Sequence, residues 1–528
     1  MKIRILSAIL ILCLIFCCVA CGQAEIDSTT EPAGTTAPTT PTIPSEPGGG
    51  SNFPSAPEVD PTKVALTVNG FEISAIELNY FYGDAINEYI SQYGQWISYI
   101  LDVSKPLSQQ YLSSDSDVTW GEHFRDAAID NAKNTYALYS AAQAAGHKLS
   151  ETEEESINKL YDNINSYIKS YGYKSVDEYL VDSYGSGADF TSYQEYYKVI
   201  LTVSSYYSAY ANQLKDSYTD AVLREFEGKE AYKYNSYTYY TYFLESKDFE
   251  SEDALKEAAK KLSDPAINTS EKFNAAIEEL EKAMDSEQST GDGGDKQYST
   301  ATEYRDKIYS GINATLQEWL RDSARVAGDI GAFPNYISDN SENKTLNGYY
   351  IVLFESVNDN TFALANVRHI LVAFEGGTYD KTTGQAIYSE AEKTKAKNEA
   401  QLIYNEWLNG DKTEDSFAEL AKKYTDDGNG DVGGIYEDIY PGQMVQTFND
   451  WCFDSSRVHG DHGLVETEFG YHIMFYSADS ETSYRDFMAS NDKLQLDMEA
   501  WQKALLDAAK LETIDTSAVN IHYVIYAG

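Results

Sequence analysis

The stretch VRHILVAF, Val367–Phe374, decides the fold of the C-terminal part of this chain. Its apolar, β-prone residues predict a strand with one histidine, His369, in its middle. A second predicted strand, EFGYHIMFY (Glu468–Tyr476), also carries one histidine, His472. Between them we expect a helix, the segment SFAELAKKYTDD (Ser416–Asp427), a glycine-rich DVGG and PGQMVQTF (Pro441–Phe448). One histidine in an apolar strand is usually a hydrogen-bonded core residue, so its neighbours decide whether it does more.

Five pieces of this region, RHILV, FAELAKKYTDD, GG, GQMVQTF and GYHI, stand in the order found in the parvulin family of peptidyl-prolyl isomerases. The chain around them is similar to extracytoplasmic foldases of the PrsA/SurA type. This resemblance implies an α+β fold, with a helical N-terminal chaperone region followed by two tandem parvulin-like domains. Each such domain is a small antiparallel sheet with flanking helices. The family implies no cofactor.

The resemblance also assigns site residues. His369 and His472 match the paired histidines that shape the family's pocket, and Thr467 matches the hydroxyl that hydrogen-bonds them. Asp427 matches the cysteine or aspartate beside the rotating carbonyl, a variability that argues against covalent catalysis. The catalytic set is therefore His369, Asp427, Thr467 and His472. The substrate-binding set is Tyr436, Met444, Phe448 and Phe469, of which Met444 and Phe448 match the wall that receives the proline ring.

One of these positions departs from the family pattern. The chain reads GGIYED where GGDLG is usual, so Tyr436 stands where a leucine of the pocket wall is expected. A tyrosine could cover a proline or narrow the pocket. No basic cluster precedes the site, which argues against recognition of a phosphoserine. Metal binding by His369, His472 and Asp427 is an alternative that no ligand spacing favours, so we expect no metal.

Composition limits the other classes of function. The 528-residue chain is too long for one core and suggests several domains. It has 84 acidic and 40 basic residues, a formal charge of −44. Such a surface repels phosphate, so we expect no nucleic-acid partner. The 44 tyrosines offer amphipathic contact area, suited to packing or to holding unfolded chains.

The first 60 residues predict export and a tether. Residues 1–20 read as a lipoprotein signal peptide, with Lys2 and Arg4 before an apolar run. Cys21 is the expected lipid-attachment site, although Cys18 stands where a leucine is usual; an ordinary secretory signal is the alternative. Residues 21–60 are rich in threonine, proline and glycine and predict a disordered linker. Cys452 is then left without a disulfide partner and is expected in the core.

An internal repeat lies ahead of the resembling region. EWLRDSARVAGDIG (318–331) and DWCFDSSRVHGDHG (450–463) are identical at eight of fourteen positions, and a strand-like run follows each. YTYYTYFL (237–244) precedes the first copy as VRHILVAF precedes the second. The first copy has Tyr350 in place of His472 and no histidine in its opening strand. We therefore predict a parvulin-like fold without the site.

These observations give a domain plan. Residues 61–230 form the helical chaperone region, 231–360 the degenerate domain, and 361–480 the isomerase domain. Residues 481–528 hold an amphipathic helix and a last strand, NIHYVIYA. By resemblance this C-terminal segment packs on the N-terminal region.

The plan favours a lipid-anchored peptidyl-prolyl cis-trans isomerase on the extracytoplasmic face of a bacterial membrane. Its partners would be unfolded, newly secreted polypeptides and, through the lipid, the membrane. Two alternatives stay open. One is a chaperone that uses both parvulin-like domains as non-catalytic scaffolds. The other is a surface-adhesion lipoprotein, which the acidity and tyrosine content favour.

Overall fold

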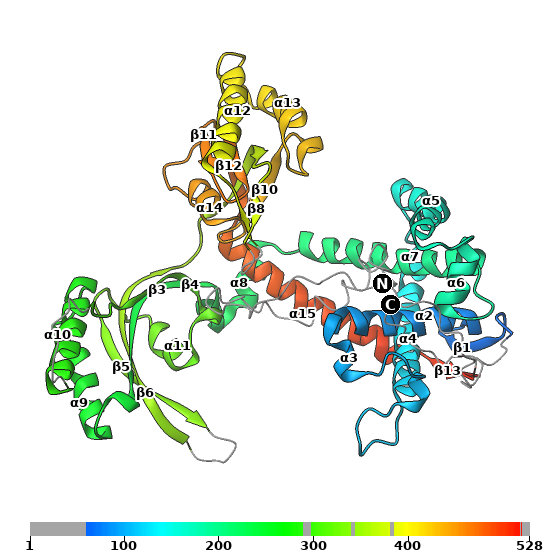
Figure 1. The fold of residues 1–528 in the computed structure, drawn as a ribbon, viewed down its shortest axis with the longest axis horizontal. Coiled ribbons are helices and arrows are strands. Elements are labelled where there is room, and N and C mark those ends of the chain that lie inside the picture. The colour runs from blue at the N-terminus through cyan, green and yellow to red at the C-terminus, as the bar shows by residue number, and fades with distance from the viewer. Residues whose placement is uncertain (1–59, 289–296, 339–343, 381–384, 518, 520–528) are drawn as a thin grey trace. The chain divides into compact units, whose positions relative to one another are not determined.

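The structure is a computed structural model that describes residues 60–288, 297–338, 344–380, 385–517 and 519. The predicted signal peptide, Cys21 and the linker up to residue 59 lie outside the described residues, as does the predicted last strand from Asn520. The described chain splits into two compact units (Figure 1). The first comprises residues 60–218 and those from Lys493 onward, and the second comprises Thr219–Asp492.

The first unit is mainly helical, and polar caps define where its helices begin. Ser74, Thr119 and Ser150 each accept a hydrogen bond from the backbone N–H three residues ahead. These caps satisfy N–H groups that a helix start leaves without partners. The helices are α2 (Ala75–Tyr93), α3 (Ile97–Ile100), α4 (Trp120–Ala144), α5 (Glu151–Ile168), α6 (Val176–Tyr184) and α7 (Phe190–Asp216).

Tyrosines fill much of the core of this unit. The buried Tyr80 ring on α2 meets the rings of Tyr184 and Tyr193 edge to face, with centroids 5.0 and 5.2 Å away. Its hydroxyl lies 2.8 Å from the Ser192 hydroxyl. The tyrosine content therefore serves core packing here.

A small sheet joins the two ends of the described chain within the first unit. β1 (Val64–Val68) and β2 (Phe71–Ser74) form a hairpin whose turn residues, Asn69 and Gly70, both have positive φ. That conformation matches the twist of paired strands and suits an Asn-Gly pair. β13 (Leu511–Thr513) pairs antiparallel with β1. The helix before it, α15 (Tyr484–Ala508), stacks Trp501 on Tyr210 of α7 at 4.2 Å.

The second unit contains two four-stranded antiparallel sheets of the same strand order. The first sheet is β4-β3-β6-β5 and the second is β10-β7-β12-β11. The first is built from β3 (Ser236–Glu245), β4 (Thr302–Ile308), β5 (Ile330–Ser338) and β6 (Lys344–Asn358), with α8 (Asp220–Glu227), α9 (Glu252–Leu262), α10 (Ser270–Gln288) and α11 (Ala314–Leu320).

The second sheet comprises β7 (Ala363–Ala373), β10 (Ile435–Ile439), β11 (His462–Glu466) and β12 (Gly470–Ser483). Its helices are α12 (Glu390–Leu408), α13 (Glu414–Tyr424) and α14 (Gln446–Cys452), and a two-stranded ribbon pairs β8 (Thr378–Tyr379) with β9 (Ala386–Ile387). Ile370, Val372 and Phe417 lie in the core between this sheet and its helices α12 and α13. The buried Cys452 lies in a second core cluster on the other side of the sheet, with Phe448 and Met474.

The repeated segments adopt the same local structure in both sheets. Arg325 lies over the Trp319 ring at 4.3 Å, and Arg457 lies over the Trp451 ring at 4.2 Å. In both copies an aspartate carboxylate accepts the N–H of the valine three residues before it. The fold class predicted from the sequence is thus confirmed: an N-terminal helical region precedes two antiparallel sheets with flanking helices.

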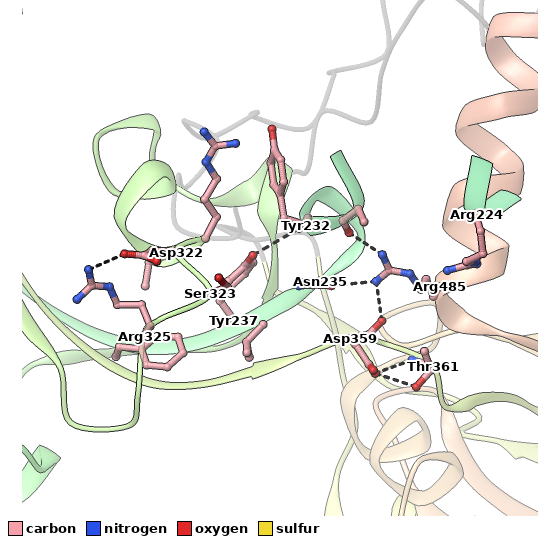
Figure 2. Close-up of a pocket in the computed structure, with 15 residues that line it drawn as sticks. Arg224, Tyr232, Asn235, Tyr237, Asp322, Ser323, Arg325, Asp359, Thr361 and Arg485 are labelled. Atoms are coloured by element: carbon pink, nitrogen blue, oxygen red, sulfur yellow. Dashed lines mark hydrogen bonds and ion pairs between the residues drawn. The ribbon is translucent and has the colours of Figure 1, made fainter. Parts of the chain in front are cut away.

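A buried arginine holds the start of α15 within the second unit. Figure 2 shows the Arg485 guanidinium directed at Asn235 and Asp359. It donates to the Asn235 amide oxygen (2.9 Å) and to the Asp359 carbonyl (3.0 Å), and it forms an ion pair with the buried Glu227. Arg485 therefore connects α8, the entry into β3 and the connection between the two sheets.

No described helix is long and apolar enough to cross a membrane.

Candidate active site

The register of β7 and β12 brings the two histidines onto one face of the second sheet. His369 lies opposite Met474, and His472 lies opposite Leu371. Residues two apart on a strand share a face, so His369 and His472 are diagonal neighbours. Their rings lie 5.2 Å apart and nearly parallel, and both side chains are buried.

Three side chains extend the histidine pair into one buried chain of polar contacts. His369 Nδ1 lies 3.0 Å from His472 Nδ1, and His472 Nε2 lies 2.9 Å from Thr467 Oγ1. At the other end, His369 Nε2 is 2.9 Å from Asp427 Oδ2, although the N–H does not point straight at that oxygen. The Tyr436 hydroxyl donates to the same carboxylate oxygen at 3.1 Å.

One order of protons satisfies all of these contacts. The Phe469 N–H donates to Thr467 Oγ1 at 3.2 Å, which leaves the threonine proton free to donate to His472 Nε2. His472 then carries its proton on Nδ1 and donates to His369 Nδ1, so His369 carries its own proton on Nε2, toward Asp427. In this order every ring nitrogen has one role, and His472 is neutral.

Burial and neighbouring charges shift the pKa values of His472, Asp427 and Tyr436. Loss of water, and then the neighbouring His369, lower the pKa of His472 to about 3. The contact with His369 lowers the pKa of Asp427 to about 2. Burial, and then the Asp427 charge, raise the pKa of Tyr436 to about 12. At neutral pH the site therefore holds one carboxylate beside neutral His472 and Tyr436.

This chain of contacts lines one side of a cavity of about 520 Å3. Phe448 presents its ring edge-on to both imidazoles, with centroids 5.4 Å from His369 and 5.3 Å from His472. The Tyr436 ring stacks on His369 at 5.2 Å, and Met444 completes this wall. The cavity can take a small apolar ring against Phe448 and Met444 with few polar groups within reach.

Local backbone geometry explains the glycines and the TDD segment of the motif. A side chain at Gly434 would place its Cβ 2.2 Å from the His369 carbonyl oxygen, so only glycine fits beside β7. Thr425 accepts the Leu371 N–H through its hydroxyl, and Asp426 donates its N–H to the Leu371 carbonyl. Asp427 is therefore held against the strand that carries His369.

The structure brings the predicted site residues together around this cavity. His369, Asp427, Tyr436, Met444, Phe448, Phe469 and His472 line it, and the buried Thr467 contacts His472 from behind. Sequence reasoning missed several lining residues: Leu371, Ala373, Phe374, Tyr388, Asp426, Gln443 and Val445. For Leu371 and Ala373 the alternation of β7 from His369 was an available signal. Tyr388 lies in no motif and carried no such signal.

The first sheet carries other residues at the corresponding positions. Tyr350 occupies the place of His472, and the register of β3 with β6 puts Thr241 in the place of His369. The rings of Phe243 and Tyr350 lie 4.6 Å apart, and Phe243 leans over Gly348. The prediction of a domain with the fold and without the histidine pair agrees with this geometry.

Among the described residues, no group of three or more histidine, cysteine, aspartate or glutamate side chains is arranged to hold a metal ion.

Comparison with known proteins identifies the second sheet. Residues 349–477 match the family model of the PPIC-type PPIase domain. This region is similar to the PPIC-type PPIase domain. A peptidyl-prolyl cis-trans isomerase named dodo from Drosophila melanogaster is 32% identical over 111 residues, which are 21% of this chain and 63% of that protein. The chain thus spans about 63% of the length of this curated relative.

Two solved structures match parts of this chain. PrsA from Bacillus anthracis is 21% identical, with a TM-score of 0.18, over 28% of this chain and 59% of its own. PrsA from Bacillus subtilis is 14% identical, with a TM-score of 0.23, over 75% of this chain and 89% of its own.

Proposed function

We propose that this chain is a peptidyl-prolyl cis-trans isomerase and foldase that acts on secreted polypeptides outside the cytoplasmic membrane. The observation that carries the proposal is the buried chain Asp427–His369–His472–Thr467 along one side of a cavity walled by Met444 and Phe448. The family match over residues 349–477 supports the same activity.

The chemistry requires no covalent step. Rotation about an Xaa-Pro bond is opposed by amide resonance, a barrier of about 18–20 kcal/mol. An enzyme lowers this barrier by binding the twisted amide better than the planar isomers. Twisting removes conjugation, so the carbonyl oxygen loses part of its negative charge and the amide prefers a drier site. A proline ring against Phe448 and Met444 would be desolvated there.

Asp427 would favour the twisted state through its charge. In this mechanism its carboxylate lies beside the rotating carbonyl, where it repels the polarised planar amide more than the twisted one. The histidine pair keeps Asp427 ionised, because contact with His369 lowers its pKa to about 2. His369 and His472 act as positioning residues for this carboxylate and for the pocket, with no proton transfer to the substrate.

The decisive experiment measures isomerisation of an unphosphorylated proline peptide by NMR exchange, using the purified full chain. We expect His369→Ala and His472→Ala each to lower kcat/KM at least tenfold. The exposed His123, in the first unit, supplies the control variant His123→Ala, whose rate should match the parent chain. If the folded parent chain shows no acceleration, the isomerase proposal is wrong, and a non-catalytic chaperone built on two parvulin-like domains becomes the better account.

The location and clients are further parts of the proposal. The apolar run before Cys21 and the threonine- and proline-rich stretch after it support a lipid anchor with a tether. Cells that express the chain with a radiolabelled fatty acid should label it at Cys21, and Cys21→Ser should abolish the label. Secreted proteins that fold slowly at an Xaa-Pro bond should refold faster when the chain is present.

A further inference from the structure

We infer that the candidate active site recognises a lysine or arginine side chain on the residue before the proline, and that Asp426 determines this preference. The inference rests on the proposed function and names its substrate class. It starts from the cavity residues that the proline wall does not use: Ala373, Phe374, Tyr388, Asp426 and Phe469.

The cavity is longer than a proline needs. His369, Leu371 and Ala373 alternate along β7, face the same side and all line it. Four residues of strand span about 13 Å, which matches about four residues of an extended peptide. One end holds His369, Phe448 and Met444. The other end of the cavity, near Ala373, is therefore available to substrate residues that neighbour the proline.

Aromatic rings and a carboxylate gather at that second end. The Phe374 and Tyr388 rings pack together at 5.1 Å, and the Phe469 side chain is 55% exposed at the rim. Asp426 is exposed, and its position is fixed, because its Oδ2 accepts the Ala373 N–H at 2.9 Å while its own N–H bonds the Leu371 carbonyl. Ring faces beside a fixed carboxylate attract a cation with an apolar stem.

The charged residues that line the cavity also favour a cationic side chain. Among the described residues that line it, Asp426 and Asp427 are acidic and none is a lysine or an arginine. Lys393, outside the lining, holds its Nζ 5.9 Å from the Phe374 ring centroid and 3.9 Å from Glu466, so a carboxylate balances its charge.

The order of groups along the cavity selects the residue before the proline. In the proposed mechanism Asp427 lies beside the carbonyl of that residue, and the proline ring lies on Phe448. Asp426 is the next residue along the chain and lies beside Leu371 and Ala373. The side chain nearest Asp426 therefore belongs to the residue whose carbonyl rotates.

The test compares three tetrapeptides with lysine, norleucine or glutamate before proline, using the full chain. Norleucine keeps the apolar stem of lysine without its charge. An ion pair with an aromatic contact predicts a kcat/KM for lysine about fivefold above norleucine, with glutamate lowest. The lysine preference should shrink in 0.5 M salt, because salt screens exposed charges.

Variants assign the preference to Asp426. Asp426→Asn keeps an oxygen for the Ala373 N–H and removes the charge, so the lysine-to-norleucine ratio should fall below about two. Asp431→Asn makes the same charge change at an exposed position outside the cavity and should keep the parent ratio. Tyr388→Leu removes one ring and leaves Asp426 in place, and it should also lower the lysine-to-norleucine ratio. It therefore tests the subsite independently if Asp426→Asn does not fold.

The outcomes separate the two claims. Equal acceleration of all three peptides, or an unchanged ratio in folded Asp426→Asn, would overturn this inference and leave the proposed function standing. No acceleration of any peptide would overturn the proposed function and this inference with it.

Discussion

His472 is held in one protonation state by the residues around it. Its Nε2 lies 2.9 Å from the Thr467 hydroxyl, and burial with the neighbouring His369 lowers its pKa to about 3. We therefore expect the ring-nitrogen NMR shifts of His472 to stay constant between pH 5 and 8, as for a neutral ring protonated at Nδ1. Thr467→Val should shift the tautomer balance, whereas Thr447→Val, whose hydroxyl bonds the Glu466 carbonyl, should not. A titration of His472 with a midpoint near 6.5 would contradict the proton order along the site.

Tyr436 does two separate things where the family usually has leucine. Its ring stacks on His369, and its hydroxyl donates to Asp427. Tyr436→Phe should lower kcat/KM about fivefold, because one hydrogen bond to a carboxylate is worth about 1 kcal/mol or more. Tyr436→Ala also removes the wall and should lower kcat/KM at least fiftyfold. A Phe variant as impaired as the Ala variant would show that the ring contributes nothing.

Single residues could be predicted from the sequence only where a motif contains them. His369, Asp427, Thr467 and His472 stand in motifs, and the structure gathers them within hydrogen-bonding distance. Tyr388 lines the same cavity but stands in no motif, and it reaches the cavity through contact with Phe374, just beyond β7. No local pattern encodes such long-range placement. Asp426 stands in the TDD segment, but the motif assigns a role only to its neighbour Asp427.

At the scale of elements, a glycine occupies the equivalent position in the two central strand pairs. A Cβ at Gly470 would lie 2.2 Å from the Val372 carbonyl oxygen, and a Cβ at Gly348 would lie 2.1 Å from that of Leu244. Gly470→Ala should therefore destabilise the second sheet by about 1–3 kcal/mol. It should also lower isomerase activity, because Thr467 and Phe469 precede the strand.

The equivalent change in the first sheet is the matched control. Gly348→Ala should lower the free energy of unfolding, measured in urea, by a similar amount. It should leave the histidine pair and the isomerisation rate as they are in the parent chain. Loss of activity in Gly348→Ala, with the second sheet still folded, would show that the two sheets depend on each other.

Elements differ in how clearly the sequence shows them. β7 and β12 are apolar runs buried on both faces and could be predicted, as could the capped helices. The partner strands β4 (TEYRDKI) and β10 (IYEDI) are short, largely exposed edge strands with charged residues. Their pairing depends on the strand beside them, so their own residues do not indicate it.

At the scale of the whole molecule, two acidic side chains of the helical unit are partly withdrawn from water. Glu77 and Asp84 lie on α2, where both are half-buried and contact tyrosines. Tyr136 donates to Glu77, and Tyr184 and Tyr196 donate to Asp84. Burial raises the pKa of Glu77 to about 7; burial, with a smaller effect of Glu88, raises that of Asp84 to about 6.

These two carboxyl groups should make the helical unit more stable in mild acid. An acid whose pKa is raised by folding favours the folded state while it is protonated, and this stability is lost as pH rises from the unfolded pKa through the folded one. For Glu77 that window runs from about 4.5 to about 7, and the full loss is about 3 kcal/mol. Urea unfolding of the full chain should show the helical transition at higher urea at pH 5.5 than at pH 8. Glu77→Gln should reduce this difference, while Glu151→Gln, at an exposed position of the same unit, should leave it unchanged. A helical unit that is equally stable or more stable at pH 8 would mean that Glu77 and Asp84 are ionised in the folded protein.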